Sequence, residues 1–64
     1  MEAFKKYTDI AFEIIRTNPL QLYNDFAKAV CNPAILGEIL DEAMHSQELL
    51  FVVTEILIKK ILSN

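Results

Sequence analysis

Two Asn-Pro pairs, Asn18-Pro19 and Asn32-Pro33, divide this chain into segments of helical length. Asparagine is a favoured N-cap residue, and proline is tolerated at the first helical position because its missing N–H would have no partner there. Proline also keeps the preceding residue out of the α conformation, so a helix that approaches from the N-terminal side ends at the pair. Each pair therefore predicts the end of one helix and the start of the next. Gln21 strengthens the first signal, because its spacing from Asn18 is that of a capping box.

The remaining sequence favours helices too. It contains one glycine and shows none of the residue pairs typical of β-hairpin turns. Apolar residues recur at helical spacing, so that each segment has an apolar face at about 100° per residue. We therefore predict an all-α fold, a small three- to four-helix bundle, with helices over about 2–17, 19–31, 33–45 and 47–62 in a single domain that covers residues 1–64.

The first three predicted helices have an inner and an outer face. The expected inner residues of the first two are Phe4, Tyr7, Ile10, Ala11, Ile14 and Ile15, followed by Leu22, Tyr23, Phe26, Ala29 and Val30. In the helix over 33–45 they are Ile35, Leu36, Ile39, Leu40 and Ala43, with Met44 at the edge. The opposite face of that helix carries Glu38, Asp41 and Glu42, which we expect to form an acidic, solvated surface suited to a basic partner.

The boundary after residue 45 is open to two interpretations. Ser46 is a good N-cap residue and Glu48 suits the positive end of a helix dipole, which favours a break or a kink. Neither glycine nor proline follows Gly37, however, so residues 33–62 would also fit one continuous helix. We favour the break near Ser46.

Residues 49–62 are apolar on more of their circumference than one contact with a core requires. One face holds Leu49, Leu50, Val52, Val53, Ile56, Leu57 and Ile61. Phe51, Ile58 and Leu62 form a second stripe on another side. If residues 33–62 are one helix, Met44 joins this stripe, and such a helix, about 45 Å long, is longer than the rest of the chain can cover. Either arrangement predicts a partner that covers the stripe.

The size of the chain supports the same prediction. At 64 residues a single core is marginal, and Cys31, the only cysteine, cannot form an internal disulfide. We expect a homodimer or a higher oligomer through the C-terminal helix, since a second copy related by a two-fold axis is the simplest partner. A second, different protein is the alternative.

Charge and composition argue against several function classes. The net charge of −3 removes the basic surface that nucleic-acid binding requires, and the 33–45 helix, the second of a pair spaced like a helix-turn-helix, is acidic. Glu55, Lys59 and Lys60 interrupt the apolar segment, so we expect no stable membrane insertion. With one unpaired cysteine and no secretory signal, we expect a complete cytoplasmic protein.

Two short patterns bear on chemistry. Glu42 and His45 have the Glu-x-x-His spacing of di-metal carboxylate bundles, but both fall on the polar side of the predicted helix. Cys31 and His45 have no glycine-rich turn beside them that would supply an oxyanion hole, so we do not expect nucleophilic catalysis. We predict no catalytic residue, no metal and no cofactor.

The sequence therefore predicts a small non-enzymatic protein that acts by protein–protein interaction, as a regulator, inhibitor, adaptor or chaperone, in a homodimer or higher oligomer. The predicted contact residues are Phe51, Ile58, Leu62, Met44, Glu38, Asp41 and Glu42. The alternatives are a di-metal carboxylate protein assembled from two copies and an amphipathic protein at a membrane surface, which Lys59 and Lys60 beside apolar residues would suit.

Overall fold

The computed structural model describes residues 5–63, and in this range the chain forms four α-helices and no strand. They are α1 (Lys6–Thr17), α2 (Leu20–Val30), α3 (Pro33–Ala43) and α4 (Gln47–Leu62). The predicted all-α fold is confirmed. The predicted start of the first helix near residue 2, and the inner position of Phe4, lie outside the described residues.

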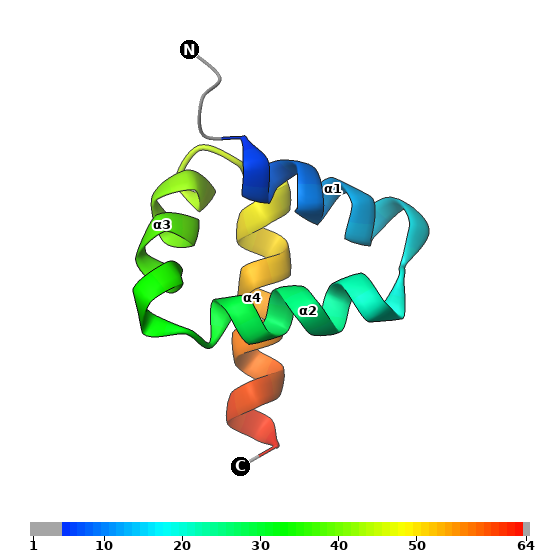
Figure 1. Cartoon of the computed structure of the whole chain (residues 1–64), viewed down its shortest axis with the longest axis vertical. Coiled ribbons are helices and arrows are strands. Elements are labelled where there is room, and N and C mark those ends of the chain that lie inside the picture. The colour runs from blue at the N-terminus through cyan, green and yellow to red at the C-terminus, as the bar shows by residue number, and fades with distance from the viewer. Residues whose placement is uncertain (1–4, 64) are drawn as a thin grey trace.

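The helices are arranged around α4. Figure 1 shows α1, α3 and α2 as three sides of a frame that α4 crosses, and α4 contacts each of the other three. The longest dimension of the molecule is 38 Å and runs along the direction of α4 (Figure 1). The C-terminal turns of α4 extend past α2, where no other described helix lies beside them (Figure 1).

The core draws on all four helices. Its ten buried apolar residues are Ala11, Ile14, Phe26, Val30, Ile39, Ala43, Leu49, Val52, Val53 and Ile56. Four of them, more than from any other helix, belong to α4. The side of α4 that carries these four residues therefore holds the other three helices together.

Two helix starts form as predicted. The side chain of Asn32 accepts a hydrogen bond from the Ala34 N–H at 3.0 Å, with Pro33 in the first turn of α3. The side chain of Ser46 accepts one from the Leu49 N–H at 3.2 Å and opens α4. The break near Ser46 is therefore confirmed, and α3 and α4 are separate helices.

The start of α2 differs from the prediction. Asn18 does not cap α2; it adopts the left-handed conformation, with φ of 51°, and ends α1 by donating its N–H to the Ile14 carbonyl at 2.9 Å. Pro19 is the N-cap residue of α2, and no side chain caps that helix end. Gln21 therefore forms no capping box and donates to Asp25 Oδ1 instead, at 3.2 Å. Asparagine tolerates the left-handed conformation better than most residues, so the signal at Asn18 suits a helix end equally well.

Several residues predicted to be inner are exposed. Ile15, Leu40, Leu50 and Ile61 all have large accessible fractions, and the largest, 71%, belongs to Ile61. The neighbouring helices cover a narrower arc of each helix than the one over which helical spacing distributes its apolar residues. The C-terminal turns of α4, to which Ile61 belongs, extend past α2 (Figure 1).

The predicted solvent exposure of Glu42 is wrong. Glu42 is buried, with 8% of its surface accessible, and its carboxylate accepts hydrogen bonds from the backbone N–H groups of Tyr7, at 3.3 Å, and Thr8, at 2.5 Å. These two N–H groups lie in the first turn of α1, where Lys5 at the N-cap position supplies no side-chain hydrogen bond. A carboxylate of α3 thus caps α1 across 34 residues of sequence, and it is stabilised there by the positive end of the α1 dipole.

We predict that Glu42→Ala lowers the free energy of unfolding by about 2 kcal/mol, because it leaves two N–H groups at the start of α1 without a charged acceptor. The matched control is Asp41→Ala, which removes an exposed carboxylate from the adjacent position. Its effect should stay within about 0.5 kcal/mol. Urea denaturation of both variants at one protein concentration measures the difference, and equal losses would show that Glu42 does not hold α1.

Candidate functional site

Large apolar side chains remain exposed along α4 after the chain has folded. Phe51, Ile58 and Leu62, which we call the α4 stripe, are 62%, 50% and 79% exposed. Leu50 and Ile61 on the same helix are also exposed. The stripe therefore lies outside the core, on the side of α4 where the sequence places it.

The last turns of α4 have no cover within the described part of the chain. Every residue from 58 to 63 is exposed, and Figure 1 shows this part of α4 past the end of the helical frame. At 100° per residue, Ile61, Ile58 and Leu62 lie within an arc of about 100°. The projecting end of α4 therefore has one continuous apolar face, with Lys59 and Lys60 beside it.

Met44 does not belong to this surface. It is 79% exposed, but it is the C-cap residue of α3 and precedes the first turn of α4. The projecting end lies at the other end of α4, which is about 24 Å long at 1.5 Å per residue. Met44 was placed in line with the stripe only if α3 and α4 were continuous, and the break at Ser46 removes that alignment.

The predicted acidic surface of α3 is smaller than expected. Asp41 and Glu38 are exposed, but Glu38 Oε1 accepts a hydrogen bond from the Tyr7 hydroxyl at 3.3 Å. Glu42 is buried against α1. Two acids of α3 thus contact the start of α1, and the carboxylates that a partner would meet are Glu38 and Asp41.

A groove that the sequence did not predict lies beside the α4 stripe. It has a volume of about 690 Å³, is open to solvent, and is formed by the end of α1, the start of α2 and the middle of α4. Its lining residues are Ile14, Ile15, Asn18, Leu20, Tyr23, Phe51, Val52, Glu55 and Lys59. The exposed residues Ile15 and Leu20 give it an apolar edge, and Phe51 belongs to both the groove and the stripe.

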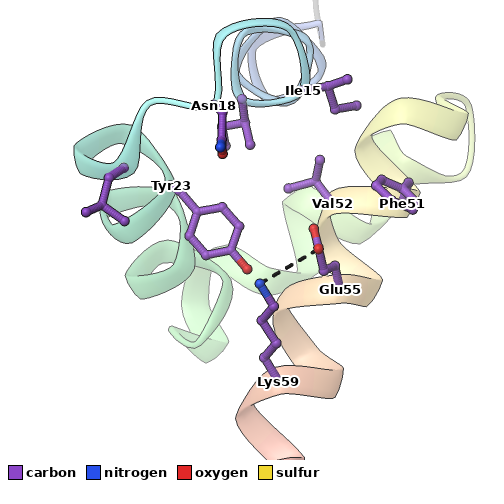
Figure 2. Close-up of a pocket in the computed structure, with 9 residues that line it drawn as sticks. Ile15, Asn18, Tyr23, Phe51, Val52, Glu55 and Lys59 are labelled. Carbon is purple, nitrogen blue, oxygen red and sulfur yellow. Dashed lines mark ion pairs between the residues drawn. The ribbon is translucent and has the colours of Figure 1, made fainter.

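One wall of the groove is polar. Lys59 Nζ lies 3.8 Å from Glu55 Oε2 and 5.1 Å from the centre of the Tyr23 ring. Figure 2 shows the Tyr23 hydroxyl directed toward these two side chains. The hydroxyl oxygen is buried and has no hydrogen-bond partner among the described residues. The groove thus combines apolar surface with one cation, one anion and one unpaired hydroxyl.

The candidate metal ligands do not come together. Within residues 5–63 no group of three or more His, Cys, Asp and Glu side chains is arranged to hold a metal ion. Glu42 is directed to the start of α1, whereas His45 is exposed in the turn after α3. Cys31 is exposed at the end of α2. Because its carboxylate is bound to α1, Glu42 is not free to join His45 in a di-metal site.

Among residues 5–63, each helix is too short or too polar to cross a membrane.

No protein-family model matches the chain, and comparison with curated proteins and with solved structures gave no match. The α4 stripe and the adjacent groove are therefore the observations on which a proposal of function rests.

We predict that Tyr23→Phe raises the free energy of unfolding by about 1 kcal/mol, because it removes a buried hydroxyl that lacks a partner. Tyr7→Phe is the matched control. Its hydroxyl donates to Glu38, so this variant should lose about 0.5 kcal/mol. Urea denaturation gives both values, and a loss of stability in Tyr23→Phe would show that its hydroxyl is hydrogen-bonded in solution.

Proposed function

We propose that this protein acts by protein–protein contact rather than by catalysis, and that it does so as a homodimer or higher oligomer assembled through α4. The observation that carries the proposal is the exposed apolar face of the projecting end of α4. Monomeric proteins expose single apolar residues routinely, but a contiguous apolar face marks an interaction site.

The energy of covering this face supports association. Full burial of a large apolar side chain is worth about 1.5–3 kcal/mol. A two-fold pair would cover Phe51, Ile58, Ile61 and Leu62 of both copies, and these side chains are half exposed or more. The gain is on the order of 10 kcal/mol, comparable to the cost of association, about 4–15 kcal/mol. We therefore expect an assembly that depends on protein concentration.

The role of Glu42 supports a function without metal chemistry. It is the carboxylate of the Glu-x-x-His pattern, and its hydrogen bonds to α1 already serve the fold. A regulator, inhibitor, adaptor or chaperone needs only a surface, and the α4 stripe supplies one. Such proteins bind through a helix face or complete a partner's bundle.

A second candidate function follows from the lysines of the same helix end. Lys59 and Lys60 lie beside Ile58, Ile61 and Leu62, an arrangement that suits contact with an anionic membrane surface. Two lysines supply about 1 kcal/mol each near such a surface, and the chain carries a net charge of −3. Co-sedimentation with anionic vesicles at low salt tests this candidate, and unbound protein would remove it.

We predict that the wild-type protein forms a dimer as its concentration rises and that Ile58→Glu remains monomeric over the same wide concentration range, because a dimer of this variant would bury a charge in the interface without a partner. Met44→Glu is the matched control. It makes the same type of change at an exposed apolar residue at the other end of the molecule, and its dimer should persist. Sedimentation equilibrium distinguishes these cases, and a wild type that is monomeric throughout would contradict the proposal.

A further inference from the structure

We infer that the occupant of the groove is a second copy of this chain, bound so that the two α4 helices run antiparallel about a two-fold axis. The projecting end of one α4 then lies along the groove of the other copy. This inference rests on the proposed self-association and names its geometry. It follows from the charges that border the stripe, from the spacing within the stripe and from the position of the groove.

The two sides of the stripe carry different residues. At 100° per residue, the side next to the groove holds Glu48, Glu55 and Lys59. The other side holds Thr54 and Ile61 and no charged residue from α4. In an antiparallel helix pair, the groove side of one stripe faces the groove side of the other. In a parallel pair, the groove side of one stripe faces the uncharged side of the other. Antiparallel pairing therefore places the charged residues of one α4 opposite those of the other, whereas parallel pairing leaves them opposite uncharged residues.

Spacing along the stripe gives the register. When Phe51 lies beside Leu62 of the second copy, the two-fold axis passes between residues 56 and 57. Glu55 of one copy then lies within about one residue, or 1.5 Å along the axis, of direct opposition to Lys59 of the other. The apolar contact and the charge pair thus form in one register, twice in each dimer.

The groove is placed to receive the helix end. Its apolar edge, Ile15 and Leu20, belongs to α1 and α2, whereas Phe51 lines the same groove from α4. Leu62 of the second copy, next to Phe51, would cover this edge. Lys59 and Glu55 line the polar wall, as Figure 2 shows, and each would gain a second partner of opposite charge there. An isologous interface of this kind fills both grooves with one symmetry operation.

Cysteine cross-linking tests this geometry directly. The experiment uses two variants, one with Phe51→Cys and the other with Leu62→Cys. Both also carry Cys31→Ser, because Cys31 is exposed and could form disulfides of its own. In the antiparallel pair residues 51 and 62 of different copies are adjacent, whereas the two residues 51 are about 16 Å apart along the axis. That separation is too long for a disulfide. When the two variants are mixed, we expect the disulfide between residues 51 and 62 in about tenfold excess over the symmetric 51–51 or 62–62 disulfide. Intact mass under non-reducing conditions measures the three products.

Each other outcome has a distinct meaning. Symmetric disulfides from each variant alone would overturn the antiparallel geometry and leave self-association in place. If the wild type is dimeric in sedimentation equilibrium but the cysteine variants form neither kind of disulfide, the interface lies away from the groove, and the inference alone is overturned. A wild type that is monomeric at all concentrations would overturn the inference together with the proposed function, and binding of that monomer to anionic vesicles would assign the helix end to a membrane surface.

Discussion

The packing of three helices against α4 is the interaction on which the rest of this structure depends. α4 contacts α1, α2 and α3 and supplies Leu49, Val52, Val53 and Ile56 to a core of ten apolar residues. Those four residues occupy one side of the helix. Because α4 is apolar beyond that side and longer than the frame it crosses, the same packing that builds the core leaves Phe51, Ile58, Ile61 and Leu62 without cover in the described chain (Figure 1). The exposed apolar face of α4 is thus a consequence of the fold.

Local signals account for the parts of the fold that the sequence predicted. The caps formed by Asn32 and Ser46 depend on residues two or three positions away, so the sequence alone specifies them. Asn18 was misassigned because an asparagine before a proline suits both the end of one helix and the start of the next, and α1 uses it. The stripe on α4 was predictable because helical spacing alone separates it from the core side.

Features that depend on contacts between helices could not be predicted from the sequence. Helical spacing placed Glu42 on a polar face, and only the position of the first turn of α1 makes that face a site for a buried carboxylate. The groove forms only where three helices meet. Of the exposed apolar residues at its edge, Ile15 had been assigned to the core and Leu20 to no face. In both cases the sequence shows the acidic or apolar character of the residue. It does not show which neighbouring helix that residue contacts.

Amide hydrogen exchange at two protein concentrations tests most directly whether the projecting end of α4 is an interface. In a monomer the residues of these turns are exposed and their amides should exchange rapidly, whereas a paired α4 should protect them. We predict that the amides of residues 58–62 gain protection as concentration rises, while those of the exposed turn around His45 stay unchanged. Equal exchange of residues 58–62 at high and low concentration, with the other amides behaving as in a folded protein, would contradict assembly through α4.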